Sequence, residues 1–378
     1  MPFLNEMLAE TERKNKNAEA LKDENTSGQD IESLHLASKA RFSSRFQFDI
    51  EAVMSAIRSE IIGQEQAVQA VEDMLKVVRA DIADPRRPLY TALLLGPTGV
   101  GKTELVRSLA RSLYGDADSF CRVDMNTLSQ EHYAASLTGA PPGYVGAKEG
   151  KTILDEEMIE GRNNIPGIVL LDEVEKASKE VLHALLNVFD NGMLTVASGE
   201  KTYSFRNSII FMTSNLAAYE IQSYEESRKK ILLKVIHRCS RKKGEGLEGI
   251  VKKKLLNTFS PEFVNRIDNI TVFNWIGEDA VGRIVELELE KLNRRLIKHS
   301  CLLTFDADVV KFISNAGYDR QFGARSIRRS VRKNLEVFLA EYLLDNHQVA
   351  LEGNDPVKYH ASVFNGKIFF KRLTYNVK

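Results

Sequence analysis

The segment from Gly96 to Thr103 constrains the fold of this chain more than any other. It reads GPTGVGKT and matches the phosphate-binding pattern G-x-x-x-x-G-K-[ST] in full. The apolar run 92–95 before it predicts a buried parallel strand, and residues 103–110 after it have the apolar spacing of a helix. In such a loop the backbone N–H groups surround a polyphosphate, Lys102 reaches the β- and γ-phosphates, and Thr103 binds Mg²⁺. The predicted phosphate-binding residues are Gly96, Pro97, Thr98, Gly99, Val100, Gly101, Lys102 and Thr103.

Two adjacent carboxylates follow a second apolar run. Residues 168–171 are aliphatic and lead directly into Asp172 and Glu173. The carboxyl ends of parallel strands are where open α/β sheets bind ligands, so these acids are predicted to lie near the phosphates. Asp172 is the candidate for orienting Mg²⁺, and Glu173 is the candidate general base that activates water. A pair of solvated acids at the end of a strand is the simpler alternative.

Further apolar stretches at 121–125, 208–212 and 270–273 predict a five-stranded parallel sheet and therefore an α/β fold. Asn215 follows the predicted strand at 208–212, where its amide could orient water beside a γ-phosphate. An Asn that caps the next helix is the alternative, and the two roles can coexist.

Composition excludes several other classes of protein. The formal net charge of the 378 residues is +0, so no overall field attracts nucleic acid or membrane. The three cysteines lie far apart in the sequence and form no C-x-x-C pair, which indicates a reducing compartment. No apolar run approaches the roughly 18 residues of a membrane span, and the first residues lack a signal-peptide core. We therefore expect a cytoplasmic protein.

The remaining segments suggest three regions. Residues 1–45 are polar and are expected to be mobile or to dock on a partner, and residues 46–275 form the large α/β domain. Residues 276–378 are expected to form a smaller α+β domain, with long helices at 278–299 and 324–344 and a C-terminal hairpin that turns at Asn365-Gly366.

Two segments of the large domain suggest contacts with a partner. A loop rich in Gly and Pro, GAPPGYVG, places Tyr144 where it could grip another molecule, although a Tyr folded back on its own loop is the alternative. A basic run such as segment 228–254 is usually a solvated helix face. The more specific interpretation is contact with nucleic acid or an acidic partner.

Several separate motifs occur in the order typical of one family. They are GPTGVGKT, GAPPGYVG, LLDEVEKA, FRN followed by MTSN, SPEFVNRID and YDRQFGAR. From about residue 46 to 375 the chain resembles an AAA+ ATPase, and in particular the second ATPase module of the Clp protein-unfolding family. The resemblance implies a P-loop NTPase domain with a C-terminal lid domain, ATP and Mg²⁺ as cofactors, and a ring of identical subunits, typically six.

The resemblance also implies roles for individual residues. Asn215 matches the residue called sensor 1, and Arg266 matches the arginine finger that is offered to the neighbouring subunit. Arg325 matches sensor 2, which contacts the γ-phosphate from the lid domain. Two pairs complete the set: Ile61 and Ile62 for the adenine pocket, and Tyr144 and Val145 for the pore loop that grips polypeptide.

The chain departs from the family in three respects. It has one ATPase module, its pore loop continues with Ala147-Lys148 where the family often has a second Tyr, and the segment 215–266 lacks an apolar-Gly-apolar tripeptide for docking on a peptidase. We therefore expect an ATP-dependent unfoldase or disaggregase that acts on protein substrates. The alternatives are the ATPase subunit of a Clp-type protease with its adaptor, an AAA+ motor or switch on nucleic acid, and a binding scaffold that no longer hydrolyses ATP.

Overall fold

The computed structural model describes residues 44–129, 153–162, 164–195, 202–221, 223, 247–319, 323–346 and 356–373. The chain divides into two compact units. The first contains the described residues up to Arg58 together with Gln66–Gly96 and Lys102–Val272, and the second contains Ser59–Glu65, Pro97–Gly101 and the residues from Phe273 onward.

A five-stranded parallel sheet forms the centre of the first unit. Its spatial order is β2-β3-β6-β1-β7. All residues of β6 are buried, as are all but one residue of β1 and of β3, which explains why these strands are nearly continuous apolar runs. The predicted five-stranded sheet is therefore confirmed. The strands are β1 (Tyr90–Leu95), β2 (Cys121–Asp124), β3 (Gly167–Asp172), β6 (Ser208–Ser214) and β7 (Asn269–Val272).

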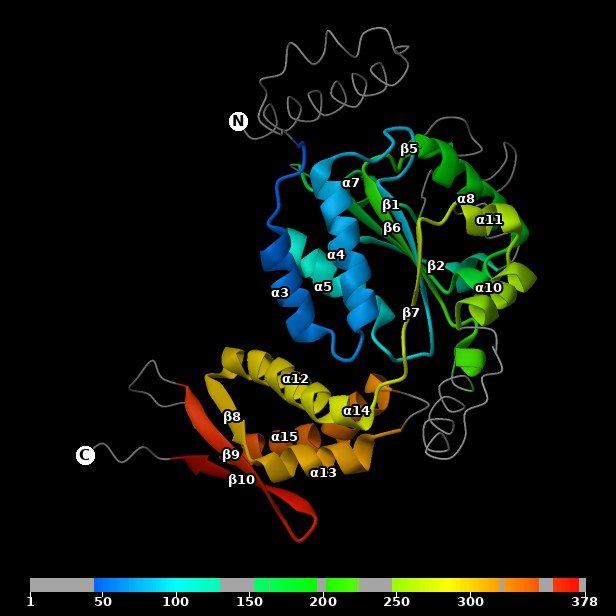
Figure 1. Ribbon diagram of the computed structural model, residues 1–378. Coiled ribbons are helices and arrows are strands. Elements are labelled where there is room, and N and C mark those ends of the chain that lie inside the picture. The colour runs from blue at the N-terminus through cyan, green and yellow to red at the C-terminus, as the bar shows by residue number, and fades with distance from the viewer. Residues whose placement is uncertain are drawn as a thin grey trace, which may run out of the picture. The chain divides into compact units, whose positions relative to one another are not determined.

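Helices cover both faces of this sheet (Figure 1). Leu93, Val169 and Ile210 share a core with helices α8, α10 and α11 on one face, and helices α3, α4 and α5 lie on the other. The six helices are α3 (Ile50–Glu60), α4 (Glu65–Ala80), α5 (Lys102–Tyr114), α8 (Lys179–Asn191), α10 (Leu247–Thr258) and α11 (Pro261–Asn265). The smaller elements of the unit are α7 (Glu156–Glu160), the 3₁₀ turns η1 (Met125–Leu128) and η2 (Val174–Lys176), and the hairpin of β4 (Met193–Thr195) and β5 (Thr202–Ser204).

The ends of α8 are specified by its sequence. Ser178 caps the first turn by accepting a hydrogen bond from the backbone N–H of Val181. Gly192 ends the helix in the left-handed region at φ 62°, where a Cβ atom would lie 2.5 Å from the side chain of Arg206. The position of the last turn of α8 is therefore fixed.

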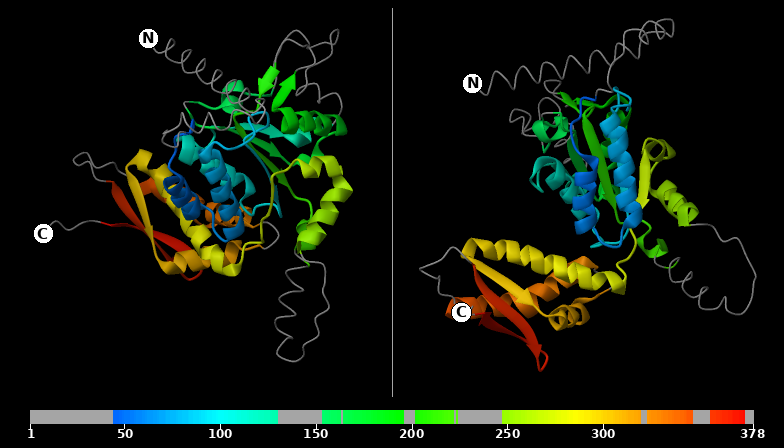
Figure 2. Two further views of the ribbon diagram at one scale, coloured as in Figure 1. Left: turned by 45° about the horizontal axis from the view of Figure 1, so that its top comes forward. Right: turned by 60° about the vertical axis from the view of Figure 1, so that its left-hand side comes forward.

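The second unit packs helices against a three-stranded sheet of order β10-β9-β8, in which β8 and β9 are parallel and β9 and β10 are antiparallel (Figure 2). Val357, Tyr359 and Ala361 alternate into its core, as their spacing predicts, and the hairpin turns at Asn365-Gly366, both with positive φ. The elements are α12 (Glu278–Leu296), η3 (Ile297–His299), β8 (Cys301–Phe305), α13 (Ala307–Gly317), α14 (Ala324–Val331), η4 (Arg332–Glu336), α15 (Val337–Asn346), β9 (Val357–Phe364) and β10 (Lys367–Leu373).

Two features of this unit differ from the sequence-based expectation. The helix expected at 324–344 consists of α14 and α15 joined by a π-helical turn, η4, whose i→i+5 hydrogen bonds widen the helix locally. Strand β8 and helix α13 were not predicted.

Within the described residues no helix is long and apolar enough to cross a membrane. The loop with Tyr144 and Val145, and most of the basic segment 228–254, lie outside the described residues.

Candidate functional site

Lys102 and Asn215 meet at the carboxyl ends of β1 and β6. Lys102 begins α5 directly after the glycine loop, is 8% exposed, and donates from Nζ to the carbonyl of Gly96 at 2.5 Å and to Asn215 Oδ1 at 2.9 Å. Asn215 also faces Glu173, with its Nδ2 3.5 Å from Glu173 Oε1. The amide of Asn215 thus lies between the ammonium group and the predicted general base.

Thr213 connects the two acids. Its hydroxyl donates to Asp172 Oδ1 and accepts a hydrogen bond from the backbone N–H of Glu173 at 3.0 Å. Asp172 also pairs with Arg122 on the neighbouring strand β2, with Nη2 2.5 Å from Oδ2. Glu173 has a left-handed backbone at φ 57°, a conformation that is uncommon for non-glycine residues and is concentrated at functional sites. The Asp172 carboxylate therefore contacts Thr213 and Arg122, whereas the Glu173 carboxylate faces Asn215.

Glu175 holds the backbone of Asn215 in place. Its Oε1 accepts a hydrogen bond from the backbone N–H of Asn215 at 3.1 Å, and its Oε2 is buried without a hydrogen-bond partner among the described residues. A second backbone contact, from Gly96 N to Ser214 O at 3.2 Å, joins the start of the glycine loop to β6. The end of β6 and Asn215, which follows it, are therefore held by Gly96 and by Glu175.

Residues 97–101 of the glycine loop belong to the second unit, where backbone groups fix their turn. Gly99 and Gly101 have φ values of 78° and 109°, which favour glycine. The Gly99 carbonyl accepts a hydrogen bond from the backbone N–H of Ala324 at 2.9 Å, and a Cβ atom on Gly323 would lie 2.7 Å from that carbonyl oxygen. Gly323 is thus required for the close approach of the two backbones.

Gln64 holds the same turn from a third segment. Its side chain is 2% exposed, donates to Asn274 O at 2.9 Å and to Val100 O at 3.4 Å, and accepts from Asn274 N at 3.0 Å. Next to it, Ile61 is buried and Ile62 packs against the core of the unit. Arg325 is exposed in the first turn of α14.

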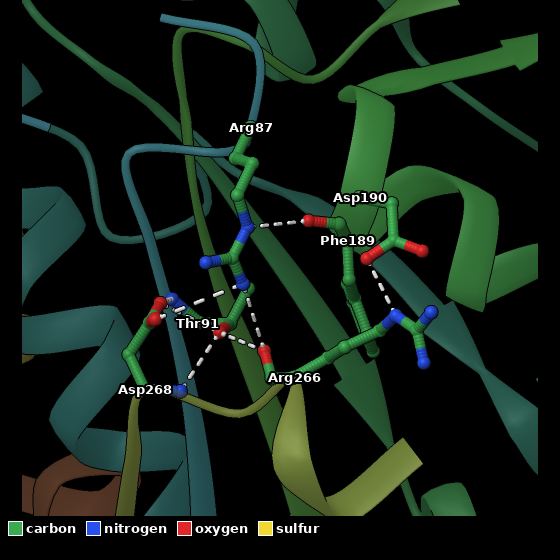
Figure 3. Close-up of polar contacts among 6 residues, drawn as sticks. All are labelled: Arg87, Thr91, Phe189, Asp190, Arg266 and Asp268. Atoms are coloured by element: carbon green, nitrogen blue, oxygen red, sulfur yellow. Dashed lines mark hydrogen bonds and ion pairs between the residues drawn. The ribbon is translucent and has the colours of Figure 1, made fainter. Parts of the chain in front are cut away.

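The backbone around Arg266 is fixed by a polar cluster in the first unit (Figure 3). Arg87 donates to Phe189 O at 2.9 Å and to Arg266 O at 3.3 Å. The Thr91 hydroxyl donates to Arg266 O at 3.1 Å and to Asp268 Oδ2 at 2.7 Å, and Asp268 Oδ2 also accepts from Thr91 N at 2.7 Å. The segment that carries Arg266 is therefore anchored to β1 and to the end of α8.

Two acids contact the Arg266 side chain. Nε lies 2.5 Å from Asp190 Oδ1, and Nη1 lies 3.0 Å from Glu262 Oε1 and 3.2 Å from the Glu262 carbonyl. The hydrogen bond to Asp190, followed by the one to Glu262, raises the pKa of the guanidinium above its ordinary value. The Arg266 side chain is 24% exposed.

The donor set at the edge of the sheet suits a magnesium ion that is bound together with phosphates. In phosphoryl-transfer sites Mg²⁺ takes one or two protein oxygens and completes its shell with substrate phosphates and water. Asp172 offers a carboxylate, and Thr103 offers a hydroxyl in the first turn of α5. Among the described residues no group of three or more His, Cys, Asp and Glu side chains could hold a metal alone.

The structure adds five residues that sequence reasoning missed, namely Gln64, Arg122, Glu175, Asp190 and Thr213. Thr213 gave the clearest signal, because a hydroxyl at the end of a buried apolar strand needs a polar partner. Gln64 directly follows Gly63 between two helical segments, which also marks a special position. Asp190 and Arg122 are ordinary charged residues in sequence, and only the fold reveals their partners.

Comparison with known proteins agrees with this geometry. Residues 87–270 match the model of an AAA domain of the Cdc48 subfamily, and residues 276–357 match the C-terminal D2-small domain of ClpB protein. An ATP-dependent protease ATP-binding subunit-like protein AmiB from Pseudomonas aeruginosa is 58% identical over 98% of this chain and all of its own length. A further ATP-dependent protease ATP-binding subunit-like protein, from Rhodococcus erythropolis, is 40% identical over 86% of this chain and 91% of its own length.

Longer relatives match over only part of their length. The ATP-dependent Clp protease ATP-binding subunit ClpC of Staphylococcus saprophyticus is 37% identical over 78% of this chain, which spans 34% of that protein. A closed-state cryo-EM reconstruction of Hsp104 with ATPγS and FITC-casein superposes with a TM-score of 0.70 and 30% identity over 85% of this chain and 51% of that one. The chain thus belongs to the Clp-type AAA+ ATPases, a family of nucleotide-binding enzymes that hydrolyse ATP.

Proposed function

We propose that this chain is the ATPase subunit of a ring that remodels protein substrates by drawing polypeptide through a central pore. The observation that carries the ATPase role is the contact network at the sheet edge, in which Lys102, Asn215 and Glu173 form one chain of contacts and Thr213 joins Asp172 to Glu173. We propose residues 46–275 as the ATPase domain and residues 276–378 as its lid. Three cysteines scattered along the sequence suit the reducing environment of the cytoplasm.

The network suggests how the chain promotes hydrolysis. Glu173 accepts a proton from the attacking water, and the Asn215 amide orients that water. Lys102 contributes positive charge to the phosphates, whose developing charge a preorganised site stabilises. When bound, a Mg²⁺ ion would supply positive charge that offsets the charge of the phosphates. Thr103 and Asp172 would hold this ion, with Ile61 and Ile62 beside the adenine and residues 96–101 around the phosphates.

Two arginines complete the proposed site. Arg325 contributes a second positive charge from α14, and Arg266 serves the nucleotide of the neighbouring subunit. Because Arg266 acts on another chain, hydrolysis depends on assembly into a ring, which we propose to be a hexamer. The fixed backbone around Arg266 supports a role that needs accurate placement.

The proposed contact with polypeptide rests on the GAPPGYVG loop, in which Tyr144 and Val145 grip the substrate. The Hsp104 reconstruction, to which this chain is similar, contains casein and supports a protein substrate. An aromatic ring buries roughly 150–250 Å² when it is fully enclosed, and alanine cannot replace that contact. Tyr144 is also the only aromatic residue from 139 to 151.

The test is to measure ATPase activity and remodelling on the same preparation of Tyr144→Ala, with casein or an aggregated model protein as substrate. We expect substantial basal ATPase activity and loss of remodelling. Tyr219→Ala is the matched control, because Tyr219 is 78% exposed and lies outside the proposed loop, and it should retain both activities. Wild-type remodelling by Tyr144→Ala would contradict the proposed grip.

A second candidate function is the ATPase subunit of a protease. The names of the relatives in Pseudomonas aeruginosa, Rhodococcus erythropolis and Staphylococcus favour it. Against it, the segment 215–266 comes no nearer to an apolar-Gly-apolar tripeptide than Glu245-Gly246-Leu247 and Glu248-Gly249-Ile250, and their acids suit an apolar cleft poorly. Co-purification of a peptidase or an adaptor with the tagged chain would favour the protease role. ATPase stimulation by DNA or RNA with a steep salt dependence would instead favour a nucleic-acid motor.

A further inference from the structure

Asp190 and Arg266 come from the ends of two helices that pack closely together. Asp190 lies in the last turn of α8, and Arg266 follows the last residue of α11. The rings of Phe189 and Phe263, one from each helix, lie 5.5 Å apart, and both side chains are almost completely buried. The positions from which Asp190 and Arg266 extend are therefore set by the core.

Hydrogen bonds fix the same two positions. Arg87 donates to Phe189 O, next to Asp190, and also to Arg266 O. One guanidinium thus joins the backbones on both sides of the ion pair, as Figure 3 shows. The distance between the Asp190 carboxylate and the Arg266 side chain cannot change without breaking these contacts or changing a rotamer.

Asp190 binds Arg266 at one particular nitrogen. The 2.5 Å contact is with Nε, while Glu262 contacts Nη1 and no group in the described part of the chain pairs with Nη2. In Figure 3 the two terminal nitrogens point away from Asp190. A guanidinium offers its donors in a rigid planar fork, so a carboxylate bound at Nε fixes the direction of the outer edge.

We propose that Asp190 is a positioning residue that orients Arg266 through Nε, so that the edge formed by Nη1 and Nη2 is presented to the phosphates of a nucleotide on the neighbouring subunit. This inference rests on the proposed function of Arg266. The contact with the exposed Glu262 carboxylate, 60% accessible, is the one that phosphate would replace, whereas the contact with Asp190 persists. The fixed guanidinium then loses little rotamer freedom when it binds phosphate.

The alternative role of the same ion pair is to neutralise Arg266, and it predicts the opposite sign. If Asp190 merely competed with phosphate, then Asp190→Ala would release Arg266 and accelerate ATP hydrolysis. If Asp190 positions Arg266, then Asp190→Ala lowers kcat about 10-fold and changes the KM for ATP less than about 2-fold. Asp190→Asn retains an oxygen acceptor for Nε and should keep most of the activity.

The test is a double-mutant cycle in the assembled ring with the steady-state ATPase as readout. Asp190→Ala is measured in the wild-type background and in Arg266→Lys, because lysine has no Nε for Asp190 to orient. Asp308→Ala is the matched control, since Asp308 is an exposed acid in an ion pair with Lys311. Sedimentation checks the assembly of each variant. Asp190→Ser, whose hydroxyl is too short to reach Nε, replaces alanine if that variant does not assemble.

If Asp190 positions Arg266, Asp190→Ala should lower the kcat for ATP about 10-fold in the wild-type background and less than about 2-fold in the Arg266→Lys protein. An equal slowing in both backgrounds, or faster hydrolysis by Asp190→Ala, overturns the role of Asp190 and leaves that of Arg266 intact. A wild-type kcat for Arg266→Lys overturns the proposed function of Arg266 itself, and the positioning role with it.

Discussion

Replacing Thr213 by valine should slow ATP hydrolysis much more than it weakens ATP binding. The two side chains have nearly the same shape, so the substitution removes the hydroxyl and leaves the packing of β6 almost unchanged. Thr213 is 2% exposed, and its hydroxyl donates to Asp172 and accepts a hydrogen bond from the backbone N–H of Glu173. Without the hydroxyl, the turn between Asp172 and Glu173 loses both of these hydrogen bonds.

The size of the effect follows from the two hydrogen bonds. A hydrogen bond to a charged group contributes about 1.5–3 kcal/mol, and a buried N–H left without a partner costs about 1–3 kcal/mol. The two effects share one hydroxyl and do not add fully, so we take about 2 kcal/mol for the substitution. If this loss falls on the transition state, kcat decreases roughly 30-fold.

The assay is steady-state ATP hydrolysis together with nucleotide titration and thermal melting. Thr213→Ser should restore most of the activity because it restores the hydroxyl. Thr271→Val is the matched control, since Thr271 is a buried threonine on β7 whose hydroxyl donates to the nearby Asn269, and kcat should stay within about 2-fold of the wild type. A lower melting temperature with unchanged kcat for Thr213→Val would show that the Thr213 hydroxyl stabilises the fold and plays no part in hydrolysis.

Three further outcomes are expected. Gln64→Ala should lower the free energy of unfolding by about 1–3 kcal/mol, because the buried Gln64 side chain no longer pairs with the N–H and C=O of the half-buried Asn274, and denaturant titration measures this. Mixing Arg266→Ala chains with Lys102→Ala chains should restore part of the ATPase activity that each lacks alone, whereas a fully active monomer in sedimentation would contradict the trans role. Burial raises the pKa of the Cys121 thiol, so less thiolate forms at a given pH, and mass spectrometry should find this residue unalkylated at pH 8 until the protein is unfolded.

Much of the first unit could be predicted because strong local signals coincide with the fold. The strands are buried on both faces, so they appear as nearly continuous apolar runs, and the glycine loop has one allowed context. The C-terminal hairpin was predictable from alternation and from Asn365-Gly366, since a tight hairpin turn needs positive φ at both positions. Lys102, Asp172 and Asn215 were expected at one sheet edge, and the structure brings them there.

The features that were missed depend on which elements become neighbours. Arg122 reaches Asp172 because β2 lies beside β3, and Asp190 reaches Arg266 because α8 packs on α11. Neither pairing leaves a trace in local spacing. Strand β8 is a short apolar run with alternate burial between two helices, so its periodicity does not distinguish it from a helical segment.

We propose that Glu173 activates water at a site where Lys102 and Thr103 bind ATP. The most direct measurement is single-turnover hydrolysis of bound ATP by Glu173→Gln, together with the affinity of this variant for ATP. The amide keeps the shape of the side chain and loses the base, so we predict near-normal ATP binding, almost no conversion to ADP, and accumulation of the ATP-bound assembly. Hydrolysis at close to the wild-type rate would contradict the role of Glu173 as the general base.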